Sequence, residues 1–148
     1  MLGASRGALD AGRPVLGVGA VVRQSGALLL VKRGHPPARG MWAVPGGKVH
    51  LGEALTKAVE RELAEETGLE GACRELVAWA EMVSDEGHYV VLDFMVDVDG
   101  PSVPRPGGDA ADVAWVPVGE LGSVALAPGM EKLLDALGIS SPYPRRLQ

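Results

Sequence analysis

The sequence is short of cysteine, of aromatic residues and of long apolar runs, and each shortage excludes a class of protein. Cys73 is the single cysteine among 148 residues, so no internal disulfide forms and a reducing, cytoplasmic setting is expected. Aromatic residues make up 4% of the chain, so the core must consist mainly of valine, leucine and alanine. The apolar runs have the length of a strand, and no apolar signal segment opens the chain. We therefore expect neither a membrane span nor a signal peptide.

Acidic residues outnumber basic residues, so the formal net charge is −5 at pH 7. This balance argues against a nucleic-acid partner, which would require a basic surface. A polyanionic small molecule would need a metal ion or a local basic patch to bind. Hydrophobic residues at 47% and charged residues at 22% are typical of a globular protein of one domain.

The order of expected elements favours an α/β fold with one domain over residues 14–138. Residues 1–13 lack periodicity and are interpreted as a flexible arm, and residues 139–148 as a tail. Helices are expected over residues 53–67 and 128–137. Strands are expected over residues 15–23, 27–31, 42–44, 74–84, 88–98 and 111–116.

The segment 88–98 alternates clearly between two faces. One face is apolar and consists of Val90, Leu92, Phe94, Val96 and Val98. The other face is mixed, with Tyr89, Val91, Asp93, Met95 and Asp97, and we expect it to meet solvent or a cleft.

The helix expected over residues 53–67 is dense in glutamate. Glu53 suits the positive end of the helix, and Gly68 supplies a left-handed stop. On a helical wheel, Glu62 and Glu66 fall in the apolar sector that Leu55, Ala58 and Val59 form, and Glu65 lies on its flank.

Carboxylates in these places conflict with local rules. A carboxylate turned towards a core needs a partner, and the last turn of a helix favours cations over Glu65 and Glu66. A divalent cation resolves both conflicts, and hard oxygen ligands suit Mg²⁺ or Mn²⁺. The alternative interpretation is a solvated acidic face without a metal.

The spacing of residues 47–69 distinguishes these interpretations. It matches the pattern G-x5-E-x7-R-E-U-x-E-E-x-G-U, where U is aliphatic, at Gly47, Glu53, Arg61, Glu62, Leu63, Glu65, Glu66, Gly68 and Leu69. The stretch resembles the Nudix box. The resemblance implies the Nudix fold, an α/β/α sandwich with a mixed β-sheet. It also implies Mg²⁺-dependent hydrolysis of a nucleoside diphosphate linked to another group.

The resemblance further implies roles for single residues. The metal ligands would be Glu62, Glu65, Glu66 and the carbonyl of Gly46. Arg61 would hold the glutamates, with Glu53 as its partner, since a guanidinium bridges carboxylates in fixed geometry. The general base stays open between Glu66 or Glu65 and a carboxylate elsewhere: Glu81, Asp85, Glu86, Asp93, Asp109 or Asp112.

The substrate side is less specified. Arg33 and Arg39 could meet phosphate or be solvated, and Trp42 could stack on a base or pack in the core. The residues around Trp42 and 88–94 are similar to Nudix members labelled ADP-ribose pyrophosphatases, although the proline typical of that specificity is missing from residues 74–84. ADP-ribose or a similar nucleotide sugar is favoured. The alternatives are hydrolysis of oxidised nucleoside triphosphates, hydrolysis of dinucleoside polyphosphates, and a non-catalytic nucleotide sensor. A homodimer is also possible, since many Nudix relatives dimerise.

Overall fold

A computed structural model describes residues 12–140 of the chain. Residues 1–11 of the expected arm and residues 141–148 of the expected tail lie outside the described residues. Ile139, which was expected in the tail, is buried and packs in a core cluster with Leu133 and Leu134.

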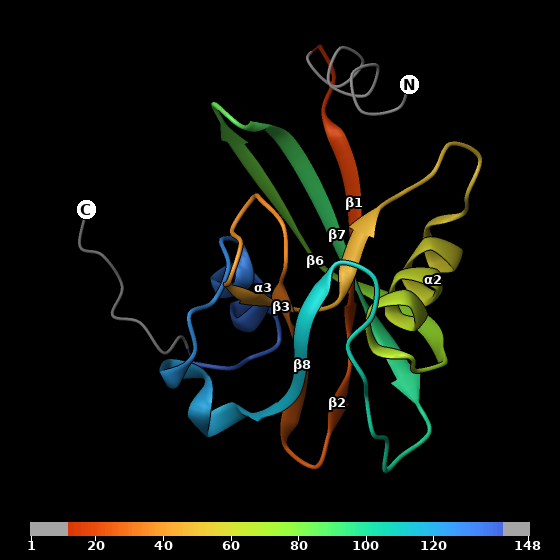
Figure 1. Ribbon diagram of the computed structural model, residues 1–148, viewed down its shortest axis with the longest axis vertical. Coiled ribbons are helices and arrows are strands. Elements are labelled where there is room, and N and C mark those ends of the chain that lie inside the picture. Colours follow the sequence, from red (N-terminus) through yellow and green to blue (C-terminus); the bar gives the residue numbers. More distant parts are fainter. Residues whose placement is uncertain (1–11, 141–148) are drawn as a thin grey trace.

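Sheet A is mixed, as predicted. Its strands lie in the order β5 (Gly46–Lys48), β1 (Val15–Val21), β7 (Gly87–Val98) and β6 (Gly71–Ser84). β1 runs parallel to β7, whereas the other two pairings are antiparallel. β6 and β7 form a long hairpin that rises on one side of the molecule (Figure 1).

Sheet B is built around β3 (Ala27–Arg33). This strand pairs antiparallel with β8 (Ala110–Pro117), β2 (Arg23–Gln24) and β4 (Trp42–Ala43). The side chains of Leu28, Leu29 and Leu30 are all fully buried. A continuous apolar run of this kind is typical of a strand that is covered on both faces.

One helix lies on each side of the sheets, which gives the predicted α/β/α arrangement (Figure 1). α2 (Leu55–Thr67) packs in a cluster with Val18, Leu29 and Phe94. α3 (Met130–Ala136) packs with Val21, Leu28 and Leu30, beside the 3-10 helix η1 (Val118–Ser123). Neighbouring residues of one strand thus serve opposite cores, because successive strand side chains alternate in direction.

Several expected boundaries differ from the structure by a few residues, among them those of α2 and β6. α2 begins at Leu55, after Ala54 in an extended conformation, and its first turn holds no acidic residue. Glu53 is therefore not an N-terminal dipole partner of this helix. β6 begins at Gly71 and contains register shifts between Cys73 and Ala78 that the pattern over residues 74–84 does not reveal. Within the described residues, no helix is long and apolar enough to cross a membrane.

Candidate active site

The candidate site lies where the last turns of α2 meet the edge strand β5. Glu66 is only 8% exposed, and its Oε1 accepts a hydrogen bond from the N–H of Gly46 at 2.8 Å. The helix ends directly afterwards at Gly68, whose φ of 72° is left-handed as predicted. The β5 edge and the helix terminus are thereby tied together by a carboxylate.

Arg61 organises the carboxylates on the neighbouring side of the helix. Its Nε and Nη2 donate to the two oxygens of Glu53, at 2.6 and 2.9 Å. Nη1 donates to Glu62 at 2.7 Å and to Glu65 at 3.2 Å, and Nη2 also reaches the carbonyl of Lys48 at 3.0 Å. Sequence reasoning anticipated the Glu53 partner and missed the Lys48 carbonyl, because backbone acceptors leave no trace in residue type.

The absence of a side chain at Gly47 makes room for Glu62. A Cβ atom added at Gly47 would lie 2.5 Å from the carboxyl carbon of Glu62 and 2.6 Å from both its oxygens. No side chain fits at that distance without moving the carboxylate. The glycine of the box therefore has a steric reason, namely the approach of a glutamate to the backbone of β5.

The carboxylates of the site differ in their electrostatic environment. Two charged hydrogen bonds from Arg61, with a further one from the His50 N–H, lower the pKa of Glu53 to about 2. Burial raises the pKa of Glu66 to about 7, and the nearby charges of Glu62 and Asp109 act in the same direction. Burial also raises the pKa of Glu62. The site thus holds one firmly ionised carboxylate and two whose charge needs a further cation.

The loop after β7 brings another carboxylate towards these residues. The N–H groups of Arg105 and Gly107 donate to the carbonyls of Thr67 and Glu66 at the C-terminal end of α2. Asp109 follows, close enough for its charge to raise the pKa values of both Glu62 and Glu66. Its Oδ1 also lies 3.4 Å from His35 Nε2. Among the carboxylates considered as a general base, Asp109 is therefore placed beside the site.

The three residues expected on the substrate side have different surroundings. Arg33 is half-buried at the end of β3, its Nε donates to the Pro37 carbonyl at 2.7 Å, and its charge lowers the pKa of Glu66. Arg39 is exposed in the loop before β4. Trp42 packs against the core cluster of α3, and its N–H and carbonyl bind Ala125 and Ala127. Trp42 therefore contributes to core packing, which was one of its two expected roles.

The donor set fits a hard divalent cation. Glu62, Glu65 and Glu66 supply carboxylate oxygens, two of them on largely buried side chains, and the chemistry of such oxygens matches Mg²⁺ or Mn²⁺. In the described part of the chain no three acidic, histidine or cysteine side chains converge as a metal cluster. The reason lies in their present partners, since Glu62 and Glu65 turn to Arg61 and Glu66 turns to Gly46.

The chain is similar to a known protein family over most of its length. The NUDIX domain model matches residues 13–137 of the chain. The chain is 32% identical over 114 residues to an ADP-ribose pyrophosphatase from Methanocaldococcus jannaschii, covering 76% of this chain and 67% of that protein. It is 35% identical over 115 residues to a putative 8-oxo-dGTP diphosphatase 2 from Mycobacterium tuberculosis, covering 74% and 77% of the two chains.

A solved structure shows the same fold. The NUDIX domain of Shewanella oneidensis NrtR, solved with ADP ribose, superposes with a TM-score of 0.73 at 24% identity, over 84% of this chain and 86% of that one. The protein belongs to the Nudix family. It is an enzyme of the Nudix hydrolase class, which acts on phosphoric anhydride bonds.

Proposed function

We propose that the protein is a Mg²⁺-dependent pyrophosphohydrolase that cleaves a nucleoside diphosphate linked to another group, with ADP-ribose or a similar nucleotide sugar as substrate. The observation that carries the proposal is the pair of carboxylates, the half-buried Glu62 and the buried Glu66, beside the Gly46–Gly47 backbone of a complete Nudix box. The similarity to an ADP-ribose pyrophosphatase supports this substrate class.

In this proposal Glu62, Glu65, Glu66 and the carbonyl of Gly46 hold Mg²⁺ or Mn²⁺. A bound divalent ion neutralises phosphate charge and lowers the pKa of a bound water. Arg61 acts as a positioning residue, because its guanidinium holds Glu53, Glu62 and Glu65 at once. Catalysis of phosphoryl transfer depends mainly on such positioning and electrostatics.

A proton must leave the attacking water, and the site offers two kinds of acceptor. Glu66 or Glu65 accepts it in our preferred assignment, since both belong to the box. Asp109 is the second candidate, because its charge acts on both Glu62 and Glu66. In the first assignment Asp109→Asn retains most of the activity, whereas in the second it loses activity as Glu66→Gln does.

Arg33 is the cation best placed to meet the phosphates. Its charge lowers the pKa of Glu66, so the guanidinium lies near that carboxylate. Arg39 lies in the same loop region, on the solvent side. Trp42 is partly buried and packs on a core cluster, so we favour its core role over a contact with the base.

A second candidate substrate is an oxidised nucleoside triphosphate such as 8-oxo-dGTP. The similarity to a putative 8-oxo-dGTP diphosphatase favours it, at an identity close to that of the ADP-ribose pyrophosphatase. The homodimer and the cytoplasmic location stay predictions.

A hydrolysis panel tests the proposal. ADP-ribose, other nucleotide sugars, 8-oxo-dGTP and dinucleoside polyphosphates are incubated with the protein and Mg²⁺, and products are separated by chromatography. We expect kcat/KM to be highest for ADP-ribose or a nucleotide sugar. A preference for 8-oxo-dGTP would replace the first substrate by the second. Binding of these nucleotides without turnover of any of them would contradict the enzymatic proposal.

A further inference from the structure

One row of residues connects the candidate site to the opposite side of sheet A. Gly46 on β5 lies opposite Gly19 on β1, Gly19 lies opposite Asp93 on β7, and Asp93 lies opposite Ala78 on β6. Adjacent strands are about 4.8 Å apart, so Asp93 is about 10 Å from the Gly46 backbone along this row. That separation is comparable to the extent of a nucleoside diphosphate.

Asp93 has an unusual environment for a carboxylate. It is 5% exposed, and its side chain makes no hydrogen bond or ion pair within residues 12–140. Its strand neighbours on the same face, Val91 and Met95, are apolar. The mixed face predicted from the alternation of β7 is therefore mostly apolar here, with one carboxylate at its centre.

The carboxyl group of Asp93 still reaches the open side of this face. In the described part of the chain, every fully buried polar side-chain atom has a hydrogen-bond partner. Since Asp93 has none, its oxygens are not fully enclosed. Oδ1 lies over the Cα of Gly19, where an added Cβ would overlap it, and the side chain of Val44 lies beside the same position.

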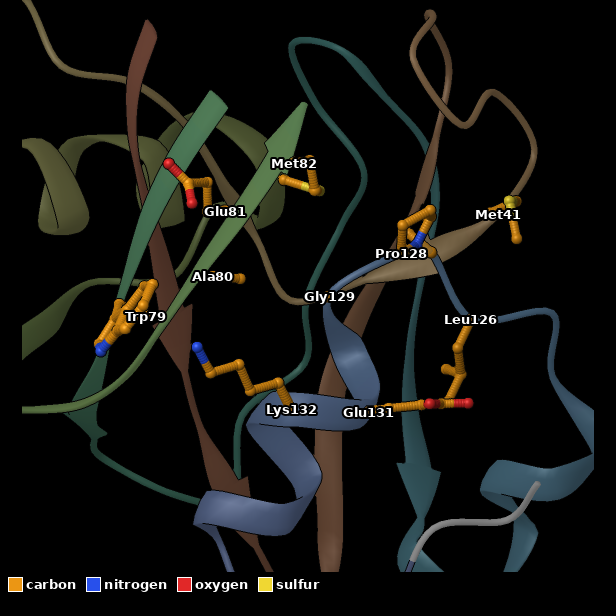
Figure 2. A pocket seen from close by; sticks show the side chains of 11 residues that line it. Met41, Trp79, Ala80, Glu81, Met82, Leu126, Pro128, Gly129, Glu131 and Lys132 are labelled. Atoms are coloured by element: carbon orange, nitrogen blue, oxygen red, sulfur yellow. The ribbon is translucent and has the colours of Figure 1, made fainter. Parts of the chain in front are cut away.

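A cavity lies against β6 near the Asp93 end of the row, although Asp93 itself does not line it. Its volume is about 710 Å³, and its lining includes Ala80 and Met82 of β6, Met41, and residues 126–129 before α3. Figure 2 shows Trp79, Ala80 and Glu81 on one side of the cavity and Met41, Leu126 and Pro128 on the other, with Lys132 and Glu131 below them. Ala80 lies opposite Val91, two residues from Asp93 on the same face, so Asp93 is its diagonal neighbour.

The face of sheet A between the β5 edge and this cavity has few side chains on β1. β1 contributes Gly17 and Gly19 to it, and neither carries a side chain. Gly17 lies opposite Lys48 of β5 and Val91 of β7, in the row next to that of Asp93. Asp93 Oδ1 and Val44 cover Gly19, so a ligand that crosses β1 from the β5 edge towards Ala80 would pass over Gly17, beside Val91.

We propose that Asp93 determines substrate specificity, by accepting a hydrogen bond from an amine of the base while the phosphates of the same molecule lie at the Gly46 end of the row. This inference rests on the proposed function. The substrate class is a nucleoside diphosphate derivative whose base carries an exocyclic amine, as adenine does. The apolar part of the lining, with Ala80, Met82 and Met41, suits the faces of such a ring, whereas the rest includes the charged Glu81, Glu131 and Lys132.

The electrostatic environment of Asp93 is consistent with a hydrogen-bond acceptor whose donor comes from the substrate. Burial raises the pKa of Asp93 to about 6, so the carboxylate is ionised at neutral pH although it lacks a partner. Burying a charge without a hydrogen bond costs free energy, and an amine of the substrate offsets that cost. A substrate without the amine would leave the carboxylate unpaired and bind less well.

The test compares ADP-ribose with its analogue in which unsubstituted purine replaces adenine, a change that removes only the amine. The ratio of kcat/KM for the two compounds is measured for the wild type, Asp93→Ala and Asp97→Ala. Asp97 is the matched control, because it lies on the same strand and face but is exposed and paired with Arg74 at 2.6 Å.

We expect the wild type to prefer adenine by about 10- to 100-fold, mainly through KM, as for one hydrogen bond to a charged group. Asp93→Ala should reduce this preference to within about threefold, and Asp97→Ala should leave it unchanged. A purely structural role of Asp93 would lower the activity on both compounds and preserve the ratio.

A wild-type ratio near one, or an unchanged ratio in Asp93→Ala, would overturn the inference about Asp93 and leave the proposed function standing. Absence of turnover of every nucleotide by the wild type would overturn both. If Asp93→Ala does not fold, the wild-type ratio and Asp93→Asn decide, and we expect the asparagine to weaken the preference for adenine.

Discussion

The two ends of the row across sheet A differ in how their carboxylates are balanced. At the β5 end, Glu53 and Glu66 each receive hydrogen bonds from the protein, at 2.6 to 3.0 Å. At the β7 end, Asp93 is buried without any such partner in the described residues. The protein positions the carboxylates of the first end by hydrogen bonds, although Glu62 and Glu66 still need a cation, whereas the carboxylate of the second end has no hydrogen bond from the protein at all. This contrast suggests a division between chemistry at β5 and recognition at β7.

The largest expected effect comes from Glu66→Gln. The variant keeps the acceptor for the Gly46 N–H but loses the charge that a metal ion needs, so kcat should fall by about 10³-fold or more. Steady-state kinetics on the best substrate of the panel measure this loss, with circular dichroism to show that the fold persists. Glu120→Gln, which changes an exposed glutamate of η1, should keep full activity. Retention of activity by Glu66→Gln with Mg²⁺ present would contradict the assignment of Glu66 as a metal ligand.

Arg61→Lys should have the next largest effect. Lysine cannot reproduce the fork that binds both oxygens of Glu53 while also reaching Glu62, so kcat should fall by about 10- to 100-fold. Arg74→Lys is the control, since Arg74 binds Asp97 on the surface. Equal kinetics of the two variants would mean that the arrangement around Arg61 is not needed for catalysis.

The pH dependence of metal activation probes Glu66 at the β5 end. Its pKa of about 7 means that Mg²⁺ competes with a proton below neutral pH. The half-saturating Mg²⁺ concentration should therefore rise about fivefold from pH 7 to pH 6, and level off above about pH 8. Initial rates over a Mg²⁺ series at each pH give this value. Asp93→Ala should show the same profile, and a pH-independent value in the wild type would contradict the assignment.

The smallest expected effect concerns stability at the β7 end. The pKa of Asp93 in the folded protein, about 6, lies above its ordinary value of 3.8, so folding binds a proton between these values. The Asp93 contribution to stability is present below pH 3.8 and is lost as pH rises through 6. Asp93→Asn removes this loss. The free energy of unfolding of the variant, relative to that of the wild type, should therefore increase by about 2–3 kcal/mol as the pH rises from 4 to 7.

Urea unfolding with a chelator present measures this difference, and the contribution of Glu66 cancels between the two proteins. Asp97→Asn should change the unfolding free energy by less than about 1 kcal/mol at any of these pH values, since its ion pair is exposed. An Asp93→Asn difference that does not vary with pH would mean that Asp93 has a partner in solution.

The sequence predicts the β5 end far better than the β7 end, for a physical reason. The residues from Gly46 to Gly68 meet through one turn and one helix, so their spacing in the sequence already defines which of them are neighbours. The partnership of Arg61 with Glu53 was predictable in this way. The start of α2 was not, because Glu53 is a plausible first-turn residue until its side chain is seen to bind Arg61.

The row at Asp93 depends instead on the parallel pairing of β1 with β7, whose partners Gly19 and Asp93 are far apart in sequence. The alternation of residues 88–98 indicated that Asp93 faces away from the apolar side. It gave no sign of Gly19 or Val44 as neighbours, because strand register is set by the whole sheet. The bulges of β6 are hidden from the sequence for the same reason.

The central claim, that the glutamates beside Gly46 form a metal-dependent pyrophosphatase site, has one direct measurement. Metal ions are removed from the protein with a chelator, followed by dialysis. The protein is then incubated with ADP-ribose in ¹⁸O-labelled water, with and without Mg²⁺. The masses of the products are measured by mass spectrometry. The account predicts AMP and ribose 5-phosphate only with Mg²⁺, with one ¹⁸O atom in one of the two products. Equal product formation with and without Mg²⁺, or products that carry no ¹⁸O, would contradict it.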